Sequence, residues 1–256
     1  MKREYKVYKP RFHQREATPQ GKLVANPVRY YASCECVIPP QPPGKWQERT
    51  LHSVAEDTHS EAWLSLEAYI REVAGSGADE LNPLAGIGPE KWMQITTLPP
   101  SIATLKSVKV LELYGSHLVR IPPEIGEMTN LREFDPYTSY HLHWFPYEIT
   151  RCKKLKRSRV STRALYGNYK YRPPFPRLPC PAARPIPASC SLCRGLFATG
   201  GSYQRWISLR VGQDVLPLLV NACSLECIEN LPQPAEGYVP EPHQGGLEIQ
   251  QPTTDP

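Results

Sequence analysis

Apolar residues recur at a fixed spacing through the middle of the chain. Segments that begin at Leu98, Ile121 and Phe145 follow one another after 23 and 24 residues, and a proline comes directly after each of these residues. Three further apolar positions are shared by all copies: Ile102, Ile125 and Ile149; Leu105, Met128 and Cys152; and Val108, Leu131 and Leu155. Repeats of this length bury their apolar sides against neighbouring copies. We therefore predict an α/β repeat over residues 98–178, with Cys152 in its core; the alternative is three amphipathic strand–helix segments that only look periodic.

The copies LPPSIATLKSVKVLELYGSHL and IPPEIGEMTNLREFDPYTSYHL resemble the leucine-rich repeat family, in the variety LPxxIxxLxxLxxLxLxxNxL that is found in many bacterial and plant proteins. The resemblance implies a short solenoid in which each copy adds one strand to a parallel sheet. It names no partner, because one scaffold serves unrelated functions. The sequence departs from the family at Ser116, which replaces the asparagine and has no clear equivalent in later copies. Pro136 and Ser158 occupy leucine positions, so we expect a distorted array with an irregular second strand.

Alternation along each strand predicts which side chains point away from the core. If Leu111 and Leu113 point inward, their neighbours point outward onto the concave face of the solenoid. Aligning the copies gives the candidate partner-binding residues: Glu112, Tyr114, Glu133, Asp135, Tyr137, Arg157 and Arg159. Their charge runs from acidic and aromatic to basic, which would orient a partner of opposite polarity.

A helix is predicted before the repeats, in THSEAWLSLEAYIREVAG. Thr58 and Glu61 have capping-box spacing, and four apolar residues (Trp63, Leu66, Ile70 and Val73) share one helical face. Proline-rich stretches mark further seams. We expect an N-terminal extension (1–50), a helical cap with a lead-in (51–97), the leucine-rich repeats (98–178), a proline-rich linker (179–189), a zinc-finger-like module (190–235) and a flexible tail (236–256).

Four of the eight cysteines lie in two close pairs, Cys190 with Cys193 and Cys223 with Cys227. Two-residue spacing places two thiolates on one turn and four-residue spacing places two on one helical turn, so four sulfurs can converge on a structural zinc ion. The surrounding sequence predicts a treble clef: a knuckle, a hairpin through RWISLRV and DVLPLLV, and a helix. ACSLECIENL is similar to the second half of MYM and TRASH type zinc fingers, although Ala222 replaces their usual aromatic residue.

Disulfide formation and redox catalysis are the alternatives to zinc binding at these cysteines. Disulfides need an oxidising compartment, and redox catalysis at CSLC lacks a preceding βαβ unit. No role is assigned to Cys34, Cys36 and Cys180. His141 and His143 are interpreted as ordinary loop histidines, because two histidines without nearby acidic residues form a weak metal-binding pattern.

Charge and composition narrow the function. Residues 151–172 hold nine Lys or Arg and no acidic residue, which leaves 21 basic and 25 acidic residues elsewhere. This basic block, together with the zinc module, is the basis for the alternative function, nucleic-acid binding. No catalytic constellation, secretory signal or membrane-spanning segment is recognised. We therefore expect a non-enzymatic, cytoplasmic protein that binds a protein partner; an enzyme using the repeats for substrate selection is a third hypothesis.

Overall fold

The computed structural model describes residues 34–40, 45–179, 187–197 and 202–253, all within one compact unit, Tyr31–Pro256. Its described part is a mixed α/β protein with two open sheets, one of four parallel strands and one of three strands in mixed directions. The predicted α/β class is therefore confirmed. Cys180 and most of the proline-rich linker lie outside the described residues.

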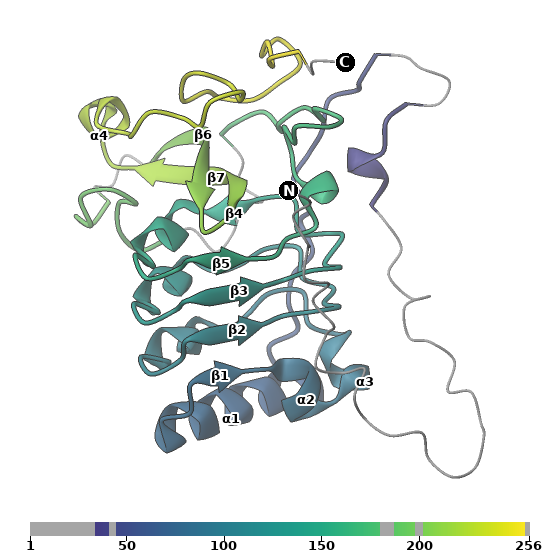
Figure 1. Ribbon diagram of the computed structural model, residues 1–256, viewed down its shortest axis with the longest axis vertical. Helices are drawn as coiled ribbons and strands as arrows, with labels where there is room; N and C mark the ends of the chain where they lie inside the picture. Colours follow the sequence, from purple (N-terminus) through teal and green to yellow (C-terminus); the bar gives the residue numbers. More distant parts are fainter. Residues whose placement is uncertain (1–33, 41–44, 180–186, 198–201, 254–256) are drawn as a thin grey trace, which may run out of the picture. The chain divides into compact units, whose positions relative to one another are not determined.

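The four-stranded sheet contains β1 (Glu80–Leu81), β2 (Val110–Glu112), β3 (Glu133–Asp135) and β5 (Arg157–Ser158), in that spatial order. Figure 1 shows these strands stacked side by side along the sheet. The strands pair so that Val110 lies beside Glu133 and Glu133 beside Arg157. This register is the one that the 23- and 24-residue spacing predicts.

Each copy contains a short 3-10 helix at an equivalent position, before its strand of the parallel sheet. The helices are η4 (Pro100–Thr104), η5 (Pro123–Glu127) and η6 (Tyr147–Arg151), and each follows a proline in extended conformation. Proline favours this place because its fixed φ suits the residue before a helix and the first helical turn needs no donor there. The repeated Pro thus sets where each short helix begins.

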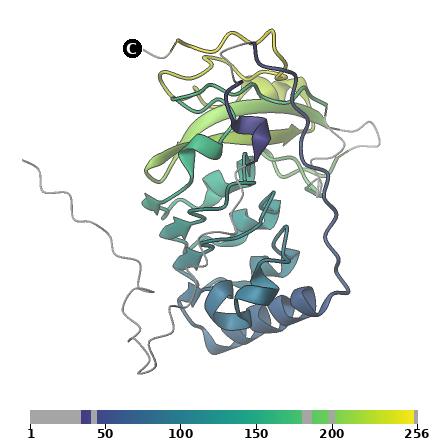
Figure 2. The same cartoon turned by 90° about the vertical axis from the view of Figure 1, so that its right-hand side faces the viewer.

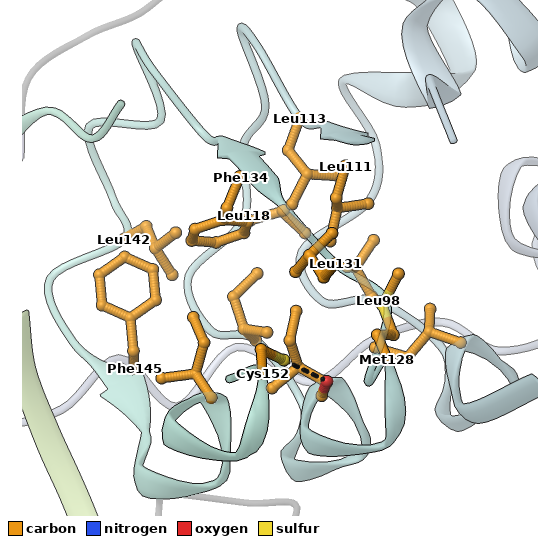
Figure 3. Packing of buried hydrophobic residues seen from close by; sticks show 14 of the residues in the cluster. Leu98, Leu111, Leu113, Leu118, Met128, Leu131, Phe134, Leu142, Phe145 and Cys152 are labelled. Atoms are coloured by element: carbon orange, nitrogen blue, oxygen red, sulfur yellow. Dashed lines mark hydrogen bonds between the residues drawn. The ribbon is translucent and has the colours of Figure 1, made fainter. Parts of the chain in front are cut away.

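The apolar positions of the copies meet in one core. Equivalent side chains such as Leu111 and Phe134 are almost completely buried, and Figure 3 shows them packed between the strands and the short helices. Cys152 belongs to this cluster, as predicted, and its Sγ donates to the Ile125 carbonyl oxygen at 3.2 Å. Burial raises the pKa of Cys152 to about 12, so it is a core residue and not a nucleophile.

A 16-residue helix, α1 (Glu61–Ser76), covers the β1 end of the array. The four residues predicted for its apolar face (Trp63, Leu66, Ile70 and Val73) are all buried. The predicted N-cap was wrong: Ser60, not Thr58, lies in extended conformation and accepts from the Trp63 amide at 3.1 Å. The helix ends at Gly77, whose φ of 69° satisfies a left-handed C-cap.

Two short helices and two 3-10 helices lie around the four-stranded sheet in the chain. The lead-in contains α2 (Pro83–Ile87) and α3 (Pro89–Trp92) after β1, and Trp92 is fully buried. Before α1 lies η3 (Glu35–Val37), and after β5 lies η7 (Thr162–Ala164). Among the described residues, none of the helices combines the length and the apolar character needed to cross a membrane.

The predicted hairpin is present as β6 (Tyr203–Val211) and β7 (Asp214–Ala222), followed by α4 (Leu225–Glu229). Strand β7 also pairs in parallel with β4 (Phe145–Pro146), the strand that opens the third copy. The hairpin shares one core with the repeats and lies at the β5 end of the array, opposite α1 (Figure 2). The cysteine-rich module and the repeats are therefore joined through a common sheet.

The departures from the repeat pattern have local explanations. Strand β3 keeps the length of β2 and ends directly before Pro136, and the chain then turns with a φ of 66° at Thr138. The irregularity thus follows the strand and does not disturb its pairing. Ser116 does have an equivalent in the second copy, contrary to our expectation: Ser139 lies 23 residues later and bonds to it.

The segment after α4 also packs on the hairpin. His243 exchanges two backbone hydrogen bonds with Trp206 of β6, at 2.8 and 3.0 Å, and its ring packs edge-on against Phe175. Burial lowers the pKa of His243 to about 4, so this histidine is neutral at physiological pH. Residues 243–249 therefore cover a second apolar cluster that contains Trp206 and Phe175.

Candidate metal centre and sheet-face site

The four predicted cysteines converge in the structure. Cys190 and Cys193 lie on a tight turn before β6, and Cys223 and Cys227 lie at the start of α4. Their sulfur atoms all lie within 4.8 Å of one another. The separations are 3.5 Å from Cys193 to Cys223 and 3.7 Å from Cys223 to Cys227. These distances match the edge of a metal–thiolate tetrahedron, about 3.8 Å for bonds of about 2.3 Å.

Local backbone geometry orients the four cysteine sulfur atoms. Ser224 caps α4 by accepting from the Cys227 amide at 3.2 Å, which orients the helical turn that carries Cys223 and Cys227. On the other side, a positive φ of 62° at Arg194 closes the turn that presents Cys190 and Cys193. The short spacings predicted these two halves, and the hairpin brings them together.

Amide groups favour the thiolate form of Cys190. Burial would raise its pKa, but backbone N–H groups of Cys193, Leu192 and Cys223 face its sulfur, and together they lower the pKa to about 7. Thiolates are the metal-binding form of cysteine, so the turn has the chemistry of a metal knuckle. The four cysteines form a candidate metal site, and the seven cysteines of the described residues are all free of disulfides.

The outward residues of the parallel sheet form what we call the sheet-face site: Glu112, Tyr114, Glu133, Asp135, Tyr137, Arg157 and Arg159. Arg159 follows β5, the edge strand of the sheet, and its side chain extends towards the other copies. Its guanidinium is 3.5 Å from Asp135 and lies over the Tyr137 ring, 4.4 Å from the centroid, and near the Tyr114 ring at 5.8 Å. Arg159, in the third copy, thereby contacts side chains from the first and second copies.

Opposite charges of adjacent strands pair within the sheet-face site. Arg157 of β5 forms an ion pair with Glu133 of β3, and Arg159 pairs with Asp135 in the same way. The side-chain charges predicted to run from acidic to basic across the copies are therefore partly neutralised by ion pairs within the protein. Glu112 lies at the acidic edge, where burial, and secondarily the charge of Asp135, raise its pKa to about 7.

A second cluster of metal-ligand side chains was missed by the sequence analysis. Cys34, Cys36, His52 and His143 lie together, with all their ligand atoms within 4.8 Å. His143, interpreted from the sequence as an ordinary loop histidine, is almost completely buried and belongs to this cluster. The C-x-C spacing of Cys34 and Cys36 was the available signal. Its histidine partners could not be found because His143 is 107 residues from Cys36 in the chain.

Comparisons with known proteins do not identify a family. No family model matches the chain, and no curated protein is significantly similar to it.

Proposed function

We propose that this protein is a leucine-rich repeat protein that holds a protein partner on its sheet-face site and does not catalyse a reaction. The observation that carries the proposal is the register of the parallel sheet. Pairing of Glu112 with Asp135, and of Glu133 with Arg157, repeats at the spacing of the copies. Repeat solenoids present such aligned side chains as extended binding surfaces.

The composition of the sheet-face site supports binding. Tyrosine and arginine are enriched among the residues that contribute most to protein–protein affinity. Tyr114 and Tyr137 lie 6.2 Å apart and Arg159 packs against both, so the three side chains are held in place before a partner arrives. Ordering them in advance reduces the entropic cost of binding. Arg157 and Arg159 form ion pairs within the protein. Direct contact of a partner with Tyr137 and Glu112 would therefore contribute more to binding affinity than long-range electrostatic attraction of that partner.

Nucleic-acid binding, the alternative function, gains no support from the contacts of the basic block. Arg151 donates to the Ser191 carbonyl oxygen and Arg172 to that of Gly237, while Arg157 and Arg159 pair with carboxylates. Those four guanidinium groups are used within the protein. Neutralising several phosphates needs cations that are available to the phosphate backbone.

For the four-cysteine site we propose a structural zinc ion in a treble-clef module of the MYM or TRASH kind. Four thiolates in a tetrahedral arrangement suit zinc or iron, and complete coordination by protein leaves no open position for substrate. The site would then fasten α4 to the turn before β6. Reduced thiolates of this kind suit a reducing compartment such as the cytoplasm.

Site-specific photo-crosslinking in a native lysate tests the binding proposal. A photoreactive phenylalanine analogue at Tyr137 should cross-link one partner, and Tyr114→Ala or Arg159→Ala should abolish that product. The matched control places the analogue at Lys153, an exposed residue outside the sheet-face site, where the same product should be absent. Equal labelling from position 153, or a product insensitive to both substitutions, would show that the sheet-face site is not the binding surface.

A further inference from the structure

The N-terminal cluster of Cys34, Cys36, His52 and His143 has the composition of a second metal site. Cys34 directly precedes η3 and Cys36 lies within it, His52 lies in the segment that leads to α1, and His143 belongs to the loop of the second copy. The Cys34 sulfur is 2.9 Å from the Cys36 sulfur and 3.2 Å from His52 Nε2. The Cys36 sulfur is 3.6 Å from His52 Nε2 and 2.9 Å from His143 Nε2. Two thiolates and two imidazoles are a common zinc ligand set.

The hydrogen bond on the far side of His143 supports this assignment. Its Nδ1 lies 2.5 Å from the Ala164 carbonyl oxygen, which can only accept. A neutral imidazole has one N–H group, so the proton is on Nδ1 and the lone pair on Nε2 faces the Cys36 sulfur. A backbone carbonyl that accepts from one ring nitrogen, and so orients the other nitrogen as a ligand, is typical of metal-bound imidazoles. The geometry thus presents His143 Nε2 as a ligand.

The distances agree with a small tetrahedral ion. Edges of a zinc site with two sulfurs and two nitrogens measure about 3.3 to 3.8 Å for bonds of about 2.0 to 2.3 Å. Three of these four separations, 2.9 to 3.2 Å, are shorter than such edges, and the fourth, 3.6 Å, lies within their range. A bound ion would need the ligand atoms to move apart by less than about 1 Å, within reach of side-chain rotation. A disulfide is a poorer description, because 2.9 Å exceeds the disulfide length of about 2.05 Å.

The four candidate ligands lie next to the second apolar cluster. Val37 and Leu51 are buried in the same cluster as Trp144 and Tyr166, and the Tyr166 ring lies 5.2 Å from that of His143. Closely spaced thiols and imidazoles are costly to bury unless protons or a cation compensate their lone pairs. A divalent cation would compensate all four ligands at once.

The ligands also lie where one segment meets the rest of the protein. We call residues 45–57 the strap; Figure 2 shows it running along the repeats towards α1. Arg177 pairs with Glu48 at one end of the strap, and Arg120 donates to the Val54 carbonyl oxygen. At the other end, the Glu56 carboxylate accepts from the amides of Thr96 and Thr97 at 2.6 and 2.9 Å. His52 lies between these contacts.

We propose that Cys34, Cys36, His52 and His143 bind a second zinc ion, which fastens η3 and the strap to the loop of the second repeat copy. All four positions come from the protein, so the ion is structural and closed to substrate. The site joins residues that are more than 100 positions apart, and it would lock the strap across successive copies. This inference is independent of the sheet-face site and of the four-cysteine site.

Metal analysis of the full chain tests the proposal. We expect about two zinc ions per chain, falling to about one in Cys34→Ser/Cys36→Ser and also to about one in Cys193→Ser/Cys227→Ser. His141→Ala is the matched control, because it lies two residues from His143 and outside the ligand set, and it should keep both ions. One zinc in the wild type, lost only with Cys193 and Cys227, would overturn this inference and leave the four-cysteine site intact. One zinc in the wild type, lost only with Cys34 and Cys36, would support this inference and contradict zinc binding at the four-cysteine site.

Two further measurements keep the test independent of whether the variants fold. Zinc X-ray absorption on the wild type should give an average of about three sulfur and one nitrogen ligands per ion if both sites are filled. A coordination of sulfur alone would contradict the second site. Hydrogen exchange of residues 45–57 should become faster in Cys34→Ser/Cys36→Ser and stay unchanged in His141→Ala. Unchanged exchange in both variants would contradict the fastening of the strap.

Discussion

Ser116 Oγ lies 2.6 Å from Ser139 Oγ, and both side chains are only 1% exposed. The two serines hold equivalent places in the first and second copies and link the loops that follow β2 and β3. Ser139 Oγ also reaches the Leu113 carbonyl oxygen at 3.4 Å, and Ser116 Oγ accepts from the Leu118 amide at the same distance. A small buried network of hydroxyls thus links the two loops at the position where the leucine-rich repeat pattern has asparagine.

The serine pair predicts a coupled loss of stability. Ser116→Ala and Ser139→Ala should each lower the free energy of unfolding by about 1 to 3 kcal/mol, because each removes the 2.6 Å hydrogen bond of a buried hydroxyl and leaves the other serine with only a 3.4 Å contact. The double variant should lose less than the sum of the two single losses, since the second substitution removes the hydroxyl that had already lost this bond. Urea unfolding of all four proteins measures this coupling. Strictly additive losses would mean that the two hydroxyls do not interact.

Glu112 predicts a pH-dependent difference between the wild type and Glu112→Gln. The folded-state pKa of Glu112 is raised from 4.5 to about 7. Its contribution to stability is therefore complete below about pH 4.5 and is lost as the pH rises through about 7. Glutamine has no such loss, so the variant should gain stability relative to the wild type between pH 5 and 8, on the order of 1 kcal/mol after solvent screening.

The measurement for Glu112 is urea unfolding at several pH values. Glu236→Gln, at an exposed position, serves as the matched control. Its stability difference from the wild type should stay constant with pH. A constant difference for Glu112→Gln as well would contradict the burial of the Glu112 carboxylate.

Substitution of Gly126 tests how closely consecutive copies pack. A Cβ at Gly126 would lie 2.7 Å from the Glu148 carbonyl oxygen, which belongs to the backbone of η6 and cannot rotate away. Gly126→Ala should therefore cost about 1 to 3 kcal/mol of stability. Gly75→Ala is the control, because nothing lies within 4 Å of its Cβ position in α1. There alanine should stabilise by up to about 1 kcal/mol through higher helix propensity.

Thermal unfolding distinguishes the two glycine variants, since their melting temperatures should move in opposite directions. A Gly126→Ala protein as stable as the wild type would show that η5 and η6 do not pack at this distance.

Ser158 predicts how the hairpin is attached to the repeats. Its Oγ donates to Asp214 Oδ2 at 2.6 Å and accepts from the Gln213 amide at 2.9 Å, next to the turn at Gly212. Ser158→Ala should lose about 1 to 3 kcal/mol. Ser158→Leu, which restores the repeat pattern, should lose more, because its extra atoms collide with the Gly212 turn.

Urea unfolding again provides the measurement for Ser158. Ser107→Ala, at an exposed serine, should stay within about 0.5 kcal/mol of the wild type. If Ser158→Leu were the more stable variant, the hairpin would not dock on β5 as the structure describes.

The sequence by itself determined the features that depend on short spacings. The recurrence of apolar residues predicted the strand register at Val110, Glu133 and Arg157, because a pleated strand and a short helix each present side chains with a fixed period. The same reasoning predicted the buried face of α1. Close pairs of cysteines predicted the sulfur cluster at Cys190 and Cys223, since each pair needs only one turn to orient its thiols.

Only the tertiary structure decided the contacts between segments that are distant in the chain. No local pattern connects Cys36 with His143 or Ser158 with Asp214, because those pairs form only when η3 and the hairpin pack against the repeats. The serine that departs from the leucine pattern marks the place where the hairpin docks. Periodicity describes how one element meets its neighbour of the same kind, whereas docking of dissimilar segments depends on side-chain packing that no single spacing encodes.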